Sequence, residues 1–508
     1  MNQGLALEIM LSGESVLLTG PAGAGKTFVL NQFVKLSKYE GKHVSVTATT
    51  GLAATHLGGT TIHSWAGIGV YDSLNPGFVE HMAKGRREII EKTDVLIIDE
   101  ISMLHDFRLD MVDEVCRLVR KVDEPFGGIQ LIMSGDFFQL PPINRGDSRA
   151  GGFVVNSQVW QTLDPVICYL SEQHRQDDEQ LLDILNAIRA GDVRRHHAEQ
   201  LLARAEVYPD DLEQLTELHT VNLDVDKLNE AKLDQLEGDE IVYGQTTSGG
   251  ANYVESLQRS VLAPASLRLK KGALVMSVKN SPERKYVNGS LGVVIDFEPY
   301  TEYPVIEFKN GKTVSMVPDT WELRDGDKKR ASITQIPLRL AWAITVHKSQ
   351  GMTLDAARID LRKAFVEGMG YVALSRVKNL NNLYLSGINQ MALRVSEDAQ
   401  TIDGILRTKA ANDAKRFAKL QKKAADRASK PEPVAKVKTG SSNWSEKIES
   451  MRETYPNAYK PWESAQDETL KEHFQNGESI EKLSKLLGRH EGSIKMRLQK
   501  HFGEDVVQ

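Results

Sequence analysis

Cysteine is scarce in this chain of 508 residues, which holds only Cys116 and Cys168, far apart and without metal-ligand spacing. A disulfide framework and a cysteine-based zinc site are therefore excluded. Long apolar runs are also missing: none approaches membrane length, and the N-terminus has no basic region followed by an apolar core and a cleavage site. We expect a protein of a reducing, cytoplasmic compartment without membrane partners, associated with the nucleoid if the source is bacterial.

An excess of positive charge is absent as well, because 63 Lys and Arg face 69 Asp and Glu and the net charge is −6. Such a balance does not by itself indicate a nucleic-acid-binding protein. The charge is uneven, however: eleven cations and three acids between Arg407 and Lys438 give +8, which leaves −14 for the rest. A protein that grips single strands needs a local groove and not a basic whole, so the overall acidity does not exclude one.

What the sequence does contain is a phosphate-binding loop. The segment GPAGAGKT follows the apolar run SVLLT and precedes a stretch with helical character. Glycines allow the backbone to curl so that its N–H groups point at a polyphosphate. Lys26 supplies a charge for the outer phosphates, and the Thr27 hydroxyl is a ligand for Mg²⁺. The loop residues expected to bind ATP are Gly20, Pro21, Ala22, Gly23, Ala24, Gly25, Lys26 and Thr27.

A second element completes this chemistry. VLIIDE, residues 95–100, is an apolar run typical of a parallel strand buried on both faces, and it ends in two carboxylates. Sites on parallel sheets form at the carboxyl ends of the strands. Asp99 would face the metal, and Glu100 would orient and deprotonate the attacking water. Together with the loop, the pair predicts a protein that binds and hydrolyses a nucleoside triphosphate.

Three further side chains are candidates for the triphosphate site. Gln139 follows the apolar run IQLIM within SGDFFQLPP, where it would sense the γ-phosphate; a Gln in such a turn is otherwise structural. Arg175 in SEQHRQ and Arg376 in YVALSRVKN stand in polar, non-periodic settings. Isolated arginines usually form solvated ion pairs. Arginines that reach the phosphoryl group from a second lobe, in contrast, accelerate its transfer about a thousandfold or more.

Two segments rich in Thr and Gly are candidates for contact with a nucleic-acid strand. The first, residues 47–69, includes His63 and Trp65, and the second is ITVHKSQGMTLD, residues 344–355. Hydroxyls and glycine N–H groups contact phosphates without reading sequence, and aromatic rings stack on bases. Trp65 is either a stacking group or a core residue. Two such loops, one in each lobe, are what a motor that walks along a strand requires.

The order of apolar runs, helical patterns and turns divides the chain into domains. Residues 1–165 alternate strands and helices, as in a parallel α/β sheet, and residues 166–270 look mainly helical. Short runs separated by NG, GS and KNG turns predict a small β-barrel inserted in the second half. In the first domain we expect strands at 15–19, 43–47, 95–99 and 129–134 and a helix at 107–121. The expected domains are 1–165, the first α/β domain; 166–271 and 336–395, the second; 272–335, the barrel; 396–442, a basic helical linker; and 443–508, a small helical domain.

These motifs, taken in order, resemble those of a known family. GPAGAGKT, TATTGLAATHLGGTTIH, LIIDEISML, PFGGIQLIMSGDFFQLPP, EQHRQ, WAITVHKSQGMTLD and YVALSRVKNLNNLYL match the helicase motif series of superfamily one. Residues 109–132, LDMVDEVCRLVRKVDEPFGGIQLI, are similar to the signature of the PIF-type (petite integration frequency) DNA helicases of the B branch. The resemblance covers residues 1–395. It implies an α/β fold with two RecA-like P-loop domains with parallel sheets and an inserted SH3-like β-barrel.

The resemblance also assigns roles to residues. It implies that the catalytic residues are Lys26, Glu100, Gln139, Arg175 and Arg376, and that the metal ligands are Thr27 and Asp99. Gln3 falls where the family reads adenine, although only two residues precede it here, and Gly351 is placed with the ATP ligands. The residues implied in binding single-stranded DNA are Thr50, Gly51, Thr61, His63, His347, Lys348 and Ser349. Translocation would run 5′ to 3′, one step per ATP, and residues 71–85 are a candidate strand-separating wedge.

The C-terminal domain lies outside this resemblance. Its sequence parses as three short helices, the first two stopped by Gly477 and Gly488, and it resembles a helix-turn-helix of the Myb-like or sigma-factor type. The third helix carries Lys495, Arg497 and Lys500, which favours contact with DNA phosphates. The alternative is a trihelical bundle that binds other replication or repair proteins.

Three functions fit the sequence. The first is a monomeric ATP-dependent DNA helicase that uses ATP and Mg²⁺, translocates on single-stranded DNA and unwinds duplex, forked or structured DNA. The second is an ATP-switched nucleic-acid-binding regulator that does not unwind, and the third is a RecD-like recombination helicase subunit. The candidate Glu100, Gln139 and arginines favour turnover over a switch. The signature at 109–132 and the lack of a large N-terminal extension favour a PIF-type enzyme, for which repair, recombination and telomere maintenance follow by analogy.

Overall fold

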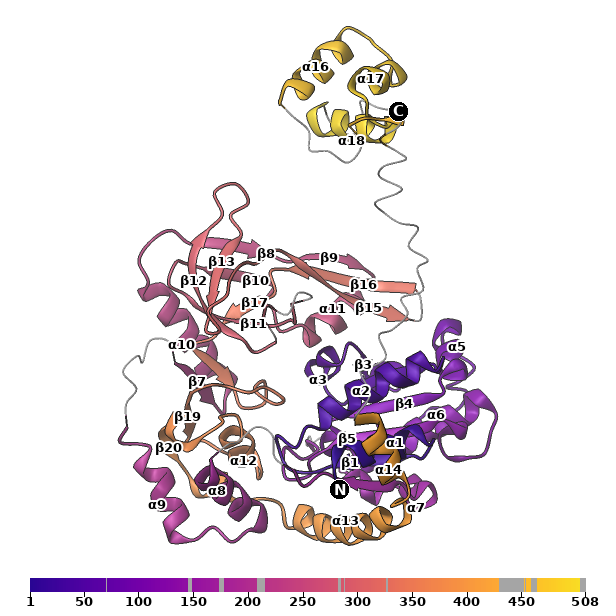
Figure 1. The fold of residues 1–508 in the computed structure, drawn as a ribbon, viewed down its shortest axis with the longest axis vertical. Helices are drawn as coiled ribbons and strands as arrows, with labels where there is room; N and C mark the ends of the chain where they lie inside the picture. Colours follow the sequence, from indigo (N-terminus) through magenta and orange to yellow (C-terminus); the bar gives the residue numbers. More distant parts are fainter. Residues whose placement is uncertain are drawn as a thin grey trace. The chain divides into compact units, whose positions relative to one another are not determined.

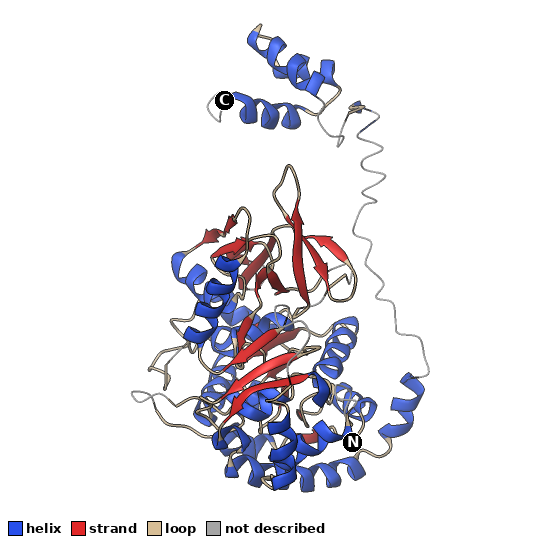
Figure 2. Ribbon diagram, turned by 90° about the vertical axis from the view of Figure 1, so that its left-hand side faces the viewer, coloured by secondary structure: helices blue, strands red, loops and turns tan. Residues whose placement is uncertain are grey.

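Residues 1–430 form one compact unit, and residues 431–508 form a second. The computed structural model describes residues 1–69, 71–144, 149–172, 178–207, 215–281, 285–286, 288–325, 328–428, 452, 454–457 and 464–502. Figure 1 traces the order of the elements, and Figure 2 shows helices packed around the strands of the first unit. This unit has two lobes, each built on a parallel sheet, so the predicted α/β fold is confirmed.

The first lobe contains a six-stranded parallel sheet in the order β3-β2-β4-β5-β1-β6. Its central strands are apolar runs buried on both faces, as predicted. The strands are β1 (Val16–Thr19), β2 (Val44–Ala48), β3 (Thr60–Thr61), β4 (Val95–Asp99), β5 (Gln130–Gly135) and β6 (Val166–Tyr169). β6 is fully buried and pairs with β1, so the first lobe extends past the boundary predicted at residue 165.

Helices cover this sheet, in line with the predicted alternation of strands and helices. They are α1 (Gln3–Leu11), α2 (Lys26–Tyr39), α3 (Gly51–His56), α4 (Ile62–Ala66), α5 (Lys84–Lys92), α6 (Asp106–Arg120) and α7 (Gln158–Leu163). α6 is the amphipathic helix predicted at 107–121, and its buried face includes Phe107, Val112 and Val119. The predicted helix and strands of this lobe lie within one residue of the observed bounds.

The second lobe contains a four-stranded parallel sheet in the order β18-β7-β19-β20. The strands are β7 (Thr216–His219), β18 (Ala343–Thr345), β19 (Ala357–Leu361) and β20 (Leu383–Ile388), and the accompanying helices are α8 (Glu179–Ala190), α9 (Arg195–Ala203), α10 (Asn222–Gln235) and α12 (Met369–Leu374). The region 166–270, expected to be mainly helical, therefore supplies a strand to each parallel sheet as well as helices.

The inserted part of the second half is antiparallel, as predicted, but it is larger than the range 272–335. Its five-stranded sheet has the order β14-β13-β12-β11-β17, and β9 joins a second sheet, β15-β16-β9. The strands, including the pair β10-β8, are β8 (Ile241–Gly244), β9 (Thr246–Gly249), β10 (Ser266–Leu269), β11 (Leu274–Ser277), β12 (Leu291–Phe297), β13 (Pro304–Phe308), β14 (Thr313–Ser315), β15 (Asp319–Asp325), β16 (Lys328–Gln335) and β17 (Leu338–Leu340). Helix α11 (Ala251–Ser260) packs on β16.

Two helices that follow the second lobe return to the first one. α13 (Glu397–Arg416) lies along β6, where the Ile167 N–H donates to Asp413 (2.9 Å) and the Tyr169 hydroxyl donates to Asp403 (2.8 Å). α14 (Leu420–Ala428) packs on α1 (Figure 1). The prediction of a linker at 396–442 is therefore wrong for α13 and α14, because α13 buries an apolar face in the main core of the first unit and α14 packs on α1.

The second unit is a bundle of three described helices, α16 (Ser464–Gln475), α17 (Ile480–Leu487) and α18 (Glu491–Phe502). Its small core consists of Leu470, Leu483, Leu487, Ile494 and Leu498. Gly488 ends α17 in the left-handed conformation, as predicted. Arg497 binds Asp467, so this cation of the third helix holds the bundle together. Among the helices that the structure describes, none combines the length and apolar character of a membrane span.

Candidate active site between the two lobes

A cavity of about 1060 Å³ opens where the lobes of the first unit face each other. Lobe one contributes the P-loop after β1, the carboxylates that end β4 and the turn after β5. Lobe two contributes the segment after β18, together with Arg376 and Lys378 shortly after α12 ends. The sequence-predicted residues that line the cavity are Ala22, Gly23, Gly25, Lys26, Thr27, Thr50, Gly51, Asp99, Glu100, Gln139, His347, Lys348, Gly351 and Arg376.

The P-loop has the curled backbone that its glycines predict. Gly20, Gly23 and Gly25 all have positive φ, and a Cβ on Gly20 would lie 2.4 Å from the Leu170 carbonyl oxygen. α2 begins at Lys26, so its N-terminal N–H groups face the cavity. The Lys26 ammonium donates to the carbonyls of Gly20 (2.8 Å) and Pro21 (3.1 Å). Burial lowers its pKa, an effect that the carboxylates of Asp136 and Glu100 oppose.

The two carboxylates lie where β4 ends. Burial raises the pKa of Asp99, while Lys26 opposes the shift. Burial and the adjacent Asp99 raise the pKa of Glu100 to about 7, close to the value that suits a general base at neutral pH. Glu100 has φ 52°, a strained backbone conformation for a residue other than glycine and one that concentrates at functional sites. Thr27 and Asp99 line the same cavity, and their hydroxyl and carboxylate oxygens are a donor set that suits Mg²⁺.

Gln350 is a site residue that the sequence did not reveal. It lies in the second-lobe loop and reaches across the cavity to lobe one. Its Nε2 donates to Glu100 Oε2 (3.0 Å) and to Gln139 Oε1 (3.2 Å). The signal available in the sequence was its place in HKSQG, between residues already considered as contacts for DNA and ATP. The contact itself spans 250 positions of the chain, which no local pattern reports.

Arg376 lines the cavity but is also bound within its own lobe. Its side chain is almost fully buried, Nε donates to the Val372 carbonyl (2.7 Å), and Nη1 donates to the carbonyls of Ser349 (3.3 Å) and Met352 (3.2 Å). Arg376 therefore holds the loop that carries Gln350. Arg175 lies outside the described residues, so a joint action of the two arginines stays a prediction.

Gln3 lies beside the P-loop, at the first residue of α1. Its Nε2 donates to the Ala24 carbonyl (3.1 Å), and Asn2 caps the helix by accepting from the Leu5 N–H (2.9 Å). The contact places an amide side chain next to the phosphate loop. Its predicted role in reading adenine stays a prediction.

The DNA-contact candidates of lobe one are partly engaged in local structure. The Thr50 hydroxyl accepts from the Ala53 N–H (3.2 Å), and the Thr61 hydroxyl accepts from the Ser64 N–H (3.2 Å) and caps α4. Gly51 begins α3. Burial, Arg108 and His105 lower the pKa of His63 to about 4, so this imidazole is neutral at physiological pH.

Trp65 is buried in the core cluster of the first unit, which decides the alternative left open by the sequence. It is a core residue of α4 and not an exposed platform for bases. The neighbouring segment 71–85, the candidate wedge, is tied to the lobe at its start because Asp72 pairs with Arg108 (2.9 Å). Tyr71 is exposed at the same place.

The candidates of lobe two are consecutive in the loop after β18, and His347 and Lys348 line the cavity. The ring of His347 stacks on the exposed Phe365, with centroids 6.4 Å apart, and burial lowers the pKa of His347. Burial and then Arg339 lower the pKa of Lys348. Ser349 is fully buried, and its hydroxyl donates to the Val346 carbonyl (2.7 Å), so this side chain shapes the loop.

Comparisons with known proteins agree with this architecture. The family model of PIF1-like helicases matches residues 5–199, and that of the 2B domain of the DNA helicase Pif1 matches residues 252–297. The ATP-dependent DNA helicase Pif1 of Psychrobacter sp. (strain PRwf-1) is 40% identical over 463 residues, covering 79% of this chain and 70% of its own length. The ATP-dependent DNA helicase PIF1 of Xenopus laevis is 39% identical, covering 78% of this chain and 62% of its own length.

Solved structures give the same picture. The structure of Bacteroides sp Pif1 in complex with ADP-AlF4 has a TM-score of 0.69 and 31% identity, and the match covers 80% of this chain and 96% of that one. The structure of Bacteroides Pif1 bound to ssDNA has a TM-score of 0.58 and 32% identity, with 81% and 97% covered.

Proposed function

Because the chain belongs to the PIF1-like family of ATP-dependent DNA helicases, we propose that it hydrolyses ATP in the cavity between its lobes and uses the hydrolysis to move 5′ to 3′ on single-stranded DNA and separate forked or duplex DNA. The observation that carries this proposal is the pair of hydrogen bonds that Gln350 makes across the cavity. These bonds join a second-lobe loop of candidate DNA contacts to Glu100 and Gln139 of the first lobe. A change in the position of that loop would therefore alter the hydrogen bond to the carboxylate that would activate water.

The residues of the cavity divide the work of hydrolysis. The P-loop amides and Lys26 would bind the outer phosphates, and Glu100 would accept the proton of the attacking water. Thr27 and Asp99 would hold Mg²⁺, which neutralises phosphate charge when bound. Arg376 would supply positive charge from the second lobe as the phosphoryl group transfers.

A strand would follow the loops of both lobes. Lys348 supplies a cation at the cavity, and Thr50 and Gly51 supply small polar groups there. Contacts of this kind bind phosphates without reading sequence. His63 and His347 would contribute as neutral groups, because burial lowers the pKa of both. The Bacteroides relative bound to ssDNA supports a strand of the same kind for this chain.

A labelled fork with a single-stranded 5′ tail tests the proposal. With ATP and Mg²⁺ the wild-type chain should separate the strands, and a fork with only a 3′ tail should stay intact. Glu100→Gln should bind the fork but lose hydrolysis about 10²–10⁴-fold, because it lacks the general base. Separation of the 3′-tailed fork would contradict the polarity. ATP-dependent binding without separation of either fork would support the regulator instead.

A further inference from the structure

A buried polar cluster joins the two lobes beside the P-loop. Its members are Ala22, Asp136 and Tyr169 from lobe one and Arg189 and Tyr371 from lobe two. We refer to these five residues as the interlobe cluster. Ala22 belongs to the P-loop, Asp136 follows β5, Tyr169 ends β6, Arg189 lies in α8 and Tyr371 lies in α12.

The Tyr371 hydroxyl is the centre of this cluster. It accepts hydrogen bonds from the Ala22 N–H (3.0 Å) and from Arg189 Nη1 (2.9 Å), and it donates to Asp136 Oδ2 (3.1 Å). These three bonds use the one donor and both acceptor positions of a phenol. Burial raises its pKa to about 12, so it remains protonated at neutral pH. A side chain of lobe two thus fixes the main chain of the phosphate loop, 349 positions away.

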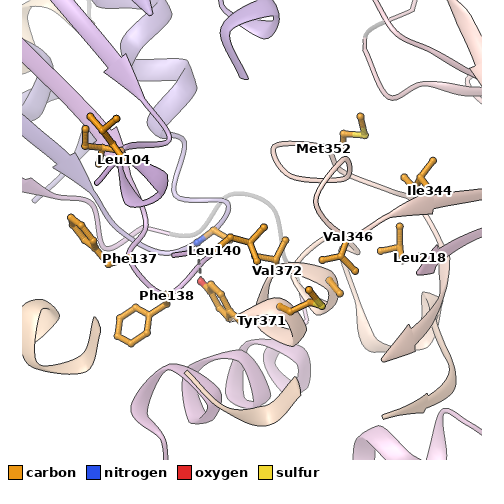
Figure 3. Close-up of a cluster of buried hydrophobic side chains, with 14 of the residues drawn as sticks. Leu104, Phe137, Phe138, Leu140, Leu218, Ile344, Val346, Met352, Tyr371 and Val372 are labelled. Atoms are coloured by element: carbon orange, nitrogen blue, oxygen red, sulfur yellow. Dashed lines mark hydrogen bonds between the residues drawn. The ribbon is translucent and has the colours of Figure 1, made fainter. Parts of the chain in front are cut away.

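Arg189 and Asp136 form the charged part of the cluster. Arg189 Nη1 contacts both carboxylate oxygens of Asp136 at 2.8 Å, and Nη2 donates to the Tyr169 hydroxyl (3.1 Å). The guanidinium lies over the Phe138 ring, 4.1 Å from its centroid, and Figure 3 shows Tyr371 and Phe138 close together. Removing one partner of a buried ion pair leaves an uncompensated charge, so we expect loss of either residue to destabilise the fold strongly.

The backbone before α12 also abuts lobe one. Gly368 has φ 81°, and a Cβ at this position would lie 2.6 Å from the Gln139 carbonyl oxygen and 2.7 Å from that of Phe138. Arg376 stands five positions after Tyr371, and its Nε is bonded to the Val372 carbonyl of the same helix (2.7 Å). The segment from 368 to 376 therefore touches lobe one at its start and holds Arg376 at its end.

We propose that Tyr371 is a positioning residue for ATP hydrolysis, whose hydroxyl fixes the P-loop main chain relative to the segment that carries Arg376. This role rests on the proposed ATPase function. Without the hydroxyl, the Ala22 N–H loses its partner and the P-loop is no longer tied to α12. The ion pair of Arg189 and Asp136 stays intact, so the fold is retained.

The test compares Tyr371→Phe with Tyr169→Phe. Both changes remove one buried hydroxyl that is bonded to Arg189, but only that of Tyr371 touches the P-loop. We expect Tyr371→Phe to lower kcat of ssDNA-stimulated ATP hydrolysis about tenfold, the effect of one hydrogen bond, and to leave KM for ATP within about twofold. KM is spared because the other loop amides and Lys26 still bind the phosphates. Tyr169→Phe should stay within about twofold of wild type in kcat.

Thermal melting of both variants separates positioning from folding. If the wild-type chain hydrolyses ATP and both variants do so with the wild-type kcat, the role of Tyr371 is overturned, whereas the proposed function still stands. An equal loss of kcat in both variants, with equal drops in Tm, would overturn it too, because the cluster would then only hold the fold. Absence of ATP hydrolysis by the wild-type chain would overturn the proposed function together with this role.

Discussion

Gln350 is the lobe-two residue that touches the candidate general base, so its removal tests communication between the lobes. Gln350→Ala should lower kcat of ATP hydrolysis about tenfold at saturating ssDNA, because Glu100 and Gln139 lose the amide that orients both. Lys348→Ala is the matched control from the same loop. It should weaken ssDNA binding and leave kcat at saturating ssDNA unchanged. An unchanged kcat in Gln350→Ala would mean that the amide only fills space.

His63 gives a residue-scale prediction about pH. Its pKa is about 4 in the folded chain, whereas an exposed histidine titrates near 6.5. Between these values the unfolded chain binds a proton that the folded chain does not, so the free energy of unfolding falls as pH drops from about 6.5 to 4. His63→Gln should remove about 1–2 kcal/mol of the loss between pH 7 and pH 5. Urea denaturation at both pH values measures it, and parallel losses in both proteins would contradict the buried, neutral imidazole.

Single residues were predictable where their role is local. Lys26, Asp99 and Gln139 each follow an apolar strand, and strand ends of one parallel sheet meet at one edge. Gln350 and Tyr371 were not predictable, because their partners lie 250 and 349 positions away and only the packed lobes bring them together. Ser349 was expected to contact DNA, but its buried hydroxyl bonds the Val346 carbonyl, which a sequence pattern does not disclose.

Secondary-structure elements were likewise predictable where their own residues determine them and not predictable where distant pairing does. Four strands of lobe one, β1, β2, β4 and β5, were predicted to within one residue, and β1, β4 and β5 are continuous apolar runs with both faces buried. β3 and β6 were not predicted. β8 and β9 were missed because they are short and expose alternate or all residues to solvent. β9 becomes a strand only through its pairing with β16, about 85 positions later in the chain, so its own residues carry little signal.

The contact of α14 with α1 is an element-scale prediction. Glu8 of α1 is fully buried, and Lys423 (3.2 Å) and Arg427 of α14 pair with its carboxylate. Arg427→Ala should lower the free energy of unfolding by about 2 kcal/mol, because Glu8 stays buried with a single cation. Lys422→Ala, an exposed position of the same helix, is the control and should change stability by less than about 0.5 kcal/mol. Equal urea midpoints for the two variants would mean that α14 is not held by this pair.

At the scale of the whole molecule, the motor unit ends later than the sequence suggests. The charged composition of residues 396–442 predicts a linker, yet α13 places Ala399, Ile402 and Leu406 in the main core. These residues are spaced three and four apart, which is the period of one buried helix face. The spacing of these apolar residues is present in the sequence, but the many charged residues around them favoured the prediction of a linker. The charged composition of this region reflects the exposed face of the helix, whereas the apolar residues of its buried face determine that the helix belongs to the first unit.

Two truncations test this boundary and the role of the second unit. A chain that ends at 430 keeps α13 and α14. Its Tm should therefore stay within a few degrees of wild type, and its ssDNA-stimulated ATPase rate should stay within about twofold. A chain that ends at 395 loses the face that covers β6 and should melt at least about 5 °C lower. If the three-helix unit binds DNA, the 430 chain should also bind forks about tenfold more weakly, since tethered sites reinforce each other. Unchanged fork binding by the 430 chain would indicate that the three-helix unit binds proteins and not DNA. Equal losses of Tm and ATPase activity in both truncations would indicate that the three-helix unit is part of the motor.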